Sequence, residues 1–252
     1  MRVWLLVGLL VAELLPNLVA AELRLLTEEA PPTSYLEAGK PTGYAVAVVE
    51  ALIQRTGQAA HIELLPWTRA YHLAKNEPDT ALFSMVRTEE REAQFQWVGP
   101  ILQGSTRFYS LRSSHLTVDS LEAAAHSGTV ALPKQWYTYE TLQQKGFTNL
   151  YGVPSSKQMV TMLKHGRVKL IATEDVTLRE ELAAGGLTPE EVQAHLAFMK
   201  SDYYIAFSPQ TDSVLVAKWQ SELDGMRHDG SLQAILQRWL PQVSQPSAQR
   251  GK

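Results

Sequence analysis

The chain has 252 residues, of which 45% are hydrophobic and 19% are charged, and this composition is typical of a folded globular protein rather than a disordered one. The formal net charge of -3 and the pI near 6.2 provide no basic surface of the kind that nucleic-acid binding requires, so we exclude nucleic acid as a partner. The chain has no cysteine, so packing alone must hold the fold.

The first residues have the order of an export signal. Arg2 precedes the apolar run VWLLVGLLVAELL, and Pro16 and the small residues VAA follow before Glu22. This order predicts a signal peptide over residues 1–21, cleaved near Ala21. A membrane anchor is the alternative, but the run is shorter than the ~20 residues that a spanning helix needs. We therefore expect a soluble periplasmic protein with no stable membrane insertion after cleavage.

Short apolar runs alternate with amphipathic stretches in the first part of the mature chain. The pattern predicts helices over 43–57, closed by Gly57, and over 68–77. It predicts strands over 22–27, 61–66, 80–85, 95–101 and 106–113. Such alternation indicates an α/β fold with a largely parallel sheet.

The same alternation restarts after the polar stretch RSSHLTVDS. Helices are predicted over 120–128, 138–146, 156–166 and 177–186, strands over 129–133, 149–154, 167–173 and 199–208, and two closing helices over 213–241. We expect two α/β domains joined by hinge strands with a cleft between them. The predicted bounds are 22–107 with 203–240 for lobe 1, 108–202 for lobe 2, and 241–252 for a disordered tail.

The stretch SMVRTEEREAQF at 84–95 places a positive charge in an unusual position. If Thr88 caps a short helix, Glu89 and Glu90 suit the positive end of its dipole. Arg91 has the wrong sign there, at the position where a capping box would have Glu or Gln. The stretch therefore raises the question of which anion Arg91 binds.

No enzyme or metal motif is present in the sequence. The seven histidines lack HExxH spacing, and there is no GxSxG elbow, Walker loop or GxGxxG fingerprint. With no cysteine and no His/Asp/Glu cluster, we predict no metal site and no cofactor.

Three segments together resemble the family 3 periplasmic solute-binding proteins. ALFSMVRTEEREAQFQWVGPI is similar to the family's strand, Thr-x-x-Arg turn and aromatic-rich strand. LKHGRVKLIATED resembles its second-lobe strand, and LDGMRHDGSLQAILQRWLP resembles its closing helices. The resemblance extends over nearly all of residues 23–240 and implies the two-lobed type II periplasmic binding protein fold.

The resemblance also implies a function and two charged contacts. Members close around a small polar solute, commonly an amino acid, and deliver it to the permease of an ABC importer. The family's Thr-x-x-Arg arginine grips the ligand carboxylate, and it falls on Arg91, whose guanidinium suits a bidentate pair. The ammonium partner falls on Glu174, with Asp175 as the alternative if the register slips by one.

Further candidate ligand-binding residues follow from the same resemblance. Trp67, Tyr35, Trp136 and Tyr137 are aromatic candidates, and Ser84 and Arg69 are polar ones. The chain departs from the family at Val86, where a hydroxyl is usual, and in the bulky second-lobe loop PKQWYTY. These departures leave the identity of the solute open.

Three functional classes stay open at this point. The first is a binding protein without enzymatic activity. The second is an enzyme on the same scaffold, similar to cyclohexadienyl dehydratase, with Glu174 as general acid if burial raises its pKa. The third is a ligand-sensing partner of a membrane receptor. The family implies a monomer, because a hinge-closing receptor needs both lobes free to move.

Overall fold

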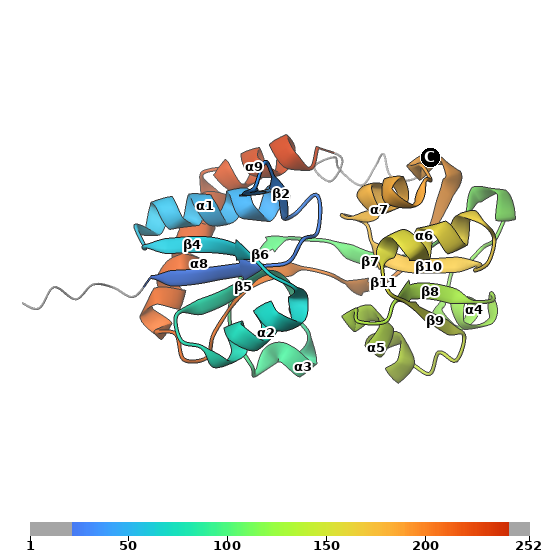
Figure 1. Ribbon diagram of the computed structural model, residues 1–252, viewed down its shortest axis with the longest axis horizontal. Coiled ribbons are helices and arrows are strands. Elements are labelled where there is room, and N and C mark those ends of the chain that lie inside the picture. The colour runs from blue at the N-terminus through green and yellow to red at the C-terminus, as the bar shows by residue number, and fades with distance from the viewer. Residues whose placement is uncertain (1–21, 242–252) are drawn as a thin grey trace, which may run out of the picture.

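The computed structural model describes residues 22–241. The predicted signal peptide and the predicted tail from residue 242 onward lie outside the described residues. Two lobes lie side by side, joined by extended segments that run between them (Figure 1). No helix in the described range is long and apolar enough to span a bilayer.

Lobe 1 is built on a five-stranded sheet in the order β4-β1-β5-β12-β6. The strands are β4 (Ala60–Leu64), β1 (Leu23–Thr27), β5 (Thr80–Val86), β12 (Tyr203–Phe207) and β6 (Gln96–Leu102). β1 runs parallel to both β4 and β5, whereas β12 runs antiparallel to β5 and β6. The sheet is therefore mixed.

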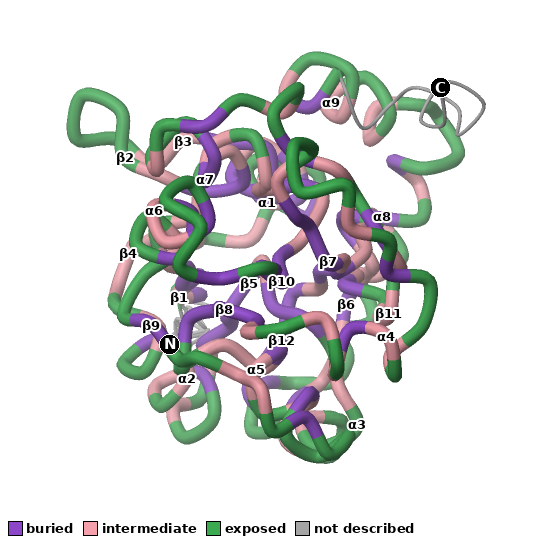
Figure 2. Tube along the Cα trace, turned by 90° about the vertical axis from the view of Figure 1, so that its right-hand side faces the viewer, coloured by how far each residue is buried: buried purple, intermediate pink, exposed green. Residues whose placement is uncertain are grey.

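Helices cover both faces of this sheet. α1 (Tyr44–Thr56), α8 (Ser213–His228) and α9 (Ser231–Trp239) share one core, while α2 (Trp67–Asn76) packs on the other side, with the short α3 (Glu89–Glu92) nearby (Figure 1). The first core is centred on fully buried residues such as Trp219 and Phe207. A small hairpin of β2 (Tyr35–Glu37) and β3 (Lys40–Thr42) projects from this lobe (Figure 2).

Lobe 2 has its own five-stranded sheet in the order β11-β7-β10-β8-β9. The strands are β11 (Val192–Lys200), β7 (Ser105–Leu111), β10 (Leu170–Glu174), β8 (Val130–Pro133) and β9 (Leu150–Val153). The helices are α4 (Leu121–His126), α5 (Tyr137–Gln144), α6 (Ser156–Lys164) and α7 (Leu178–Gly185), with 3-10 turns η1 (Arg112–Ser114) and η2 (Pro189–Glu191). A separate hydrophobic core holds this lobe together.

The chain passes between the two sheets twice. It leaves the first sheet at Leu102 and enters the second at Ser105, and it returns between Lys200 and Tyr203. Lobe 2 is therefore one continuous segment, whereas lobe 1 is assembled from two separate parts of the chain. Buried backbone follows the strands of both sheets, and exposed backbone is concentrated in the outer turns (Figure 2).

Most predicted elements form close to their predicted bounds. α1 ends because Gly57 adopts a left-handed conformation, with φ of 64°, which glycine tolerates without a Cβ clash. Two expectations were wrong. The strand predicted over 199–208 is interrupted where the chain crosses between the lobes: its first two residues end β11, its later part forms β12, and most of β11 was not predicted. Neither sheet is largely parallel, since each has two parallel and two antiparallel pairings.

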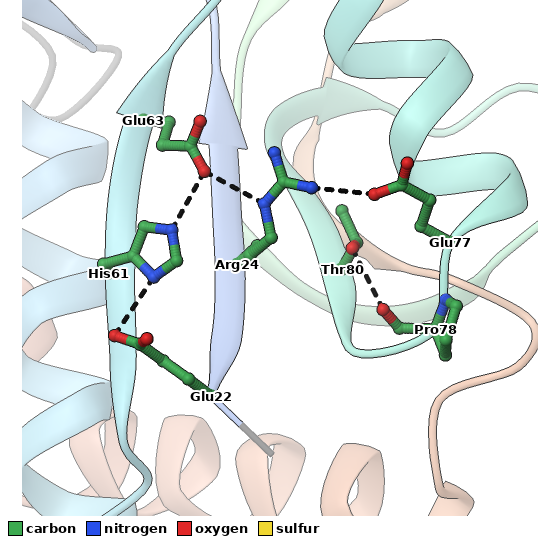
Figure 3. A network of polar contacts seen from close by, with 7 residues as sticks. All are labelled: Glu22, Arg24, His61, Glu63, Glu77, Pro78 and Thr80. Carbon is green, nitrogen blue, oxygen red and sulfur yellow. Dashed lines mark hydrogen bonds and ion pairs between the residues drawn. The ribbon is translucent and has the colours of Figure 1, made fainter.

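A polar network lies on the lobe 1 sheet near the start of β1, away from the cavity between the lobes (Figure 3). The Arg24 guanidinium donates to Glu63 at 3.0 Å and to Glu77 at 2.7 Å. His61 contacts Glu22 at 3.1 Å and Glu63 at 2.9 Å. The network links β1 to β4 and to the turn before β5, so it helps to hold these neighbouring strands side by side in the sheet.

Candidate ligand-binding site

A cavity of about 420 Å³ lies between the lobes, within the range of roughly 300–1,000 Å³ typical of small-molecule sites. Its lining comes from the ends of strands in both sheets. Glu28 follows β1, Val86 ends β5, Glu174 ends β10, and Ser155 lies just after β9. The carboxyl ends of parallel strands thus face the cavity, as is usual for ligand sites in α/β folds.

Arg91 is a partly buried cation that has no anionic partner in the described part of the chain. Its Nη1 donates to the Val86 carbonyl at 3.1 Å, and no carboxylate within residues 22–241 forms an ion pair with it. Its Cζ lies 5.3, 5.7 and 5.7 Å from the ring centroids of Trp67, Tyr71 and Tyr137. Burial lowers the pKa of Arg91, so an arriving anion would meet a poorly hydrated guanidinium.

The helix around Arg91 differs from a well-capped one. α3 begins after Thr88, but the Thr88 side chain makes no capping hydrogen bond. Three of the four residues of α3 are acidic, and Arg91 is the remaining one. The Arg91 guanidinium faces the cavity, so an anion there can pair with it directly.

Glu174 lies at the end of β10 and accepts hydrogen bonds on both oxygens. Tyr137 Oη donates to Glu174 Oε1 at 2.8 Å, and the Tyr203 hydroxyl donates to Oε2. Burial raises the pKa of Glu174 to about 8, although the bond from Tyr137 opposes this shift. Asp175 instead accepts from the Ser105 N–H at 3.0 Å and lines a second pocket, together with Gln103 and Lys200. Of the two predicted alternatives, Glu174 is therefore the residue on the cavity wall.

Further carboxylates line the cavity. Burial raises the pKa of Glu28 to about 7, with the Arg91 charge opposing the shift. Burial also raises the pKa of Glu181 to about 7, although Thr173 and Thr177 donate to it at 2.7 and 2.9 Å. Carboxyls with raised pKa values in a cleft are candidates for a functional site.

The loop that carries Glu28 is held in place by its backbone. The Ser34 hydroxyl donates to the Glu28 carbonyl at 2.8 Å, and the Ala45 N–H donates to the Thr33 carbonyl at 2.9 Å. Gly43, at φ 125°, allows this approach, because a Cβ there would lie 2.5 Å from the Thr33 oxygen. The start of α1 therefore positions the loop that contributes Glu28.

Ser84 has a backbone conformation that is rare for serine. Its φ is 60°, within β5, opposite the register shift between Tyr204 and Ile205 of β12. Its Oγ is buried and has no hydrogen-bond partner in the described structure, although the residue lines the cavity. Such strain at a cavity wall is typical of a functional position.

The structure brings most of the predicted site residues together and leaves two outside. The cavity is lined by six of them: Arg91, Glu174, Trp67, Ser84, Trp136 and Tyr137. Tyr35 does not line it, because it lies on the projecting hairpin, paired with Thr42. Arg69 is exposed and does not line the cavity. It is two residues after Trp67 on α2, and residues two apart face different sides of a helix.

Sequence reasoning missed several polar residues of the site, among them Glu28, Glu180, Glu181 and Tyr203. For Glu28 a signal existed, because it directly follows a predicted strand whose carboxyl end was expected to face the cleft. Glu180 and Glu181 come from α7, in a stretch that sequence alone reads as an ordinary acidic first turn. Within residues 22–241 no group of three or more His, Cys, Asp or Glu side chains is placed to hold a metal ion.

The chain belongs to the bacterial extracellular solute-binding proteins, family 3, whose family profile matches residues 23–242. No curated protein sequence matches the chain. The family assignment agrees with the resemblance in the sequence.

Several solved structures share the two-lobed fold. A histidine kinase sensor domain with similarity to periplasmic binding proteins superposes with a TM-score of 0.76 at 20% identity, covering 87% of this chain and 96% of the domain. The arginine-, lysine-, histidine-binding protein ArtJ of Geobacillus stearothermophilus gives 0.73 at 16%, covering 91% and 99%. An ancestral arginine-binding protein bound to arginine gives 0.71 at 18%, covering 87% and 98%. At these identities the matches establish the fold.

Proposed function

We propose that the protein captures a small, carboxylate-bearing, amino-acid-like solute by closing its two lobes, and delivers it to the permease of an ABC importer. The observation that carries this proposal is Arg91, a partly buried cation on the cavity wall without an anionic partner in the described chain. A ligand carboxylate supplies that partner, and a guanidinium binds it through two parallel hydrogen bonds.

The lobes contribute one basic and one acidic residue to the proposed contacts. Arg91 belongs to lobe 1 and Glu174 to lobe 2, so a solute with a carboxylate and an ammonium group bridges the cavity between them. Binding that contacts both lobes favours the closed arrangement over the open one, which is capture by population shift. Amino-acid-binding proteins with the same fold support this solute class.

A thermal-shift screen of mature protein (22–252) against amino acids, polyamines, organic acids and small peptides tests the proposal. A ligand at 100 times its Kd stabilises the fold by about 2.7 kcal/mol, which raises Tm by several degrees. Arg91→Ala should abolish the shift. Arg87→Ala is a matched control, because Arg87 also stacks on two rings, Trp97 and Tyr204, but does not line the cavity.

The proposal would fail if no carboxylate compound shifts Tm, or if the shift survives Arg91→Ala. We also infer that binding occurs without turnover, since the family consists of solute-binding proteins. The enzyme alternative is supported by one observation, the raised pKa of Glu174. Mass spectrometry of the ligand after long incubation decides between them: unchanged ligand supports binding alone, and a converted product supports an enzyme.

A second candidate function is ligand sensing at a membrane receptor, and the shared fold of the histidine kinase sensor domain supports it. The two roles differ in what is lost when the protein is absent. Uptake of labelled solute should fall in cells that lack an importer's binding protein. Cells that lack a sensory partner should keep uptake and lose the transcriptional response to the solute.

A further inference from the structure

Resting on the proposed function, we infer that the solute carries a net positive charge: it is an α-amino acid with a cationic side chain, and that side chain binds beside Glu180 and Glu181 of lobe 2. This assigns a second charged subsite to the cavity, in addition to the carboxylate contact at Arg91 and the ammonium contact at Glu174.

Acidic residues far outnumber basic ones on the cavity wall. Arg91 is the one basic residue among the described residues that line it. Five glutamates share the wall: Glu28, Glu29, Glu174, Glu180 and Glu181. A cleft lined mainly by one sign of charge concentrates ions of the opposite sign. A neutral amino acid pairs one carboxylate with Arg91 and one ammonium with a glutamate, and it leaves the excess of acid uncompensated.

Glu174 is poorly suited to hold two cations. Each of its oxygens already accepts a phenol hydroxyl, from Tyr137 and from Tyr203. About two of the four lone-pair sites of the carboxylate remain, which serve the ammonium group of the solute. A second cationic group must therefore find its partner among the other carboxylates of the wall.

The carboxylates on α7 have acceptor capacity that the protein does not use. Glu180 Oε2 has almost no solvent-accessible surface and no hydrogen-bond partner among the described residues. Glu181 is buried, and the hydroxyls of Thr173 and Thr177 fix one hydrogen bond on each of its oxygens. A buried carboxylate oxygen without a donor, such as Glu180 Oε2, is costly, and a ligand cation supplies both the charge and the donor.

The opposing lobe adds a further acid. Glu28 of lobe 1 lines the same cavity, and its side chain forms no hydrogen bond with residues 22–241.

A carboxylate in the first turn of α7 is also favoured by the helix dipole. Stabilisation of the helix dipole does not explain why Glu180 and Glu181 both lie on the cavity wall, whereas binding of a cation there does.

Matched ligand pairs test the charge directly on the mature chain. Calorimetry compares arginine with citrulline and lysine with norleucine, because each pair differs little in size and differs in side-chain charge. We expect the cationic member to bind at least tenfold more tightly. Glu180→Gln should reduce that ratio severalfold, and Glu181→Gln should act in the same direction. Glu190→Gln, an exposed lobe 2 substitution outside the cavity, is the control.

The outcomes separate this inference from the proposed function. Equal binding of both members through Arg91 would overturn the charge inference and leave the proposed function standing. A ratio unchanged in both Glu180→Gln and Glu181→Gln would overturn the α7 subsite. If no amino acid binds, charged or neutral, the proposed function itself fails, and this inference fails with it.

Discussion

The ring of Tyr137, from lobe 2, lies 5.7 Å from the guanidinium carbon of Arg91 in lobe 1. The hydroxyl of the same tyrosine donates to Glu174 at 2.8 Å. One side chain thus contacts both residues that are proposed to hold the ends of the solute. It also packs against the lobe 1 core, so it connects the lobes in the absence of any solute.

Substitutions of Tyr137 should separate its two contacts. Tyr137→Phe keeps the ring over Arg91 and removes the donor to Glu174, so we expect a loss of about 1 kcal/mol of stability. Tyr137→Ala removes both contacts and should let the ligand-free lobes move apart. Small-angle X-ray scattering should then show a larger radius of gyration for Tyr137→Ala than for Tyr137→Phe. Identical scattering curves would contradict the linking role.

Substitutions of Ser84 should separate the effect of its strained backbone on stability from the effect of its hydroxyl on ligand affinity. Ser84→Ala keeps the Cβ and removes the unpartnered hydroxyl, so Tm should be nearly unchanged while ligand affinity falls about fivefold, as expected for one lost hydrogen bond. Ser84→Gly should in addition relieve the strain of the left-handed backbone, which is about 1–2 kcal/mol for a residue with a Cβ. The larger conformational entropy that glycine loses on folding offsets part of this gain in stability. Thermal unfolding and calorimetry measure both effects. Unchanged affinity in Ser84→Ala would show that the hydroxyl makes no ligand contact.

The acidic cavity should make the empty protein less stable as pH rises. The folded-state pKa values of Glu28, Glu174 and Glu181 are raised to about 7, 8 and 7 from 4.5. The folded protein therefore binds more protons than the unfolded chain between pH 4.5 and 8, and stability falls with pH across this window. We expect Tm to drop by several degrees from pH 5.5 to 8.

The control for this pH dependence is Glu174→Gln, which removes the group with the largest raised value. Its Tm should change less between pH 5.5 and 8 than that of the unaltered protein. Nearby Arg91 and the Tyr137 hydroxyl are retained in this variant, so their contributions cancel in the comparison. A parallel loss of Tm in both proteins would place the titrating groups elsewhere.

Substitutions of two residues on α2 test which face of that helix lines the cavity. Trp67 lies under the Arg91 guanidinium at 5.3 Å, so Trp67→Leu should loosen Arg91 and reduce carboxylate affinity about tenfold, within the 0.5–2 kcal/mol typical of a cation over a ring. Arg69→Ala should leave affinity unchanged, because Arg69 is exposed outside the cavity. Titration calorimetry measures both, and a large effect of Arg69→Ala would contradict the assigned orientation.

Local patterns in the sequence were enough to predict most elements and the family. Gly57 ended α1 as expected, and the strand before Glu174 brought that residue to the cavity. Side-chain direction was harder to predict. Trp67 and Arg69 are close in sequence and differ in which side of α2 they occupy, and Tyr35 lies on a hairpin whose direction only tertiary contacts determine.

The acidic character of the site could not be predicted for a related reason. Glu28 and Glu181 are more than a hundred residues apart in the chain and meet only because the two sheets face each other. The division of the strand predicted over 199–208 was missed because the crossing between β11 and β12 is only two residues long. Non-local placement of this kind leaves no periodic pattern in the sequence.

The position of β12 determines when lobe 1 can fold during synthesis. This strand lies between β5 and β6 in the sheet, yet it follows the whole of lobe 2 in the chain. A ribosome therefore releases every strand of lobe 2 before the middle of the lobe 1 sheet exists. Lobe 2 can fold as it emerges, whereas β6 has no neighbour in its sheet until Tyr203–Phe207 is made. The lobe 1 sheet is therefore completed only after lobe 2 has been synthesised.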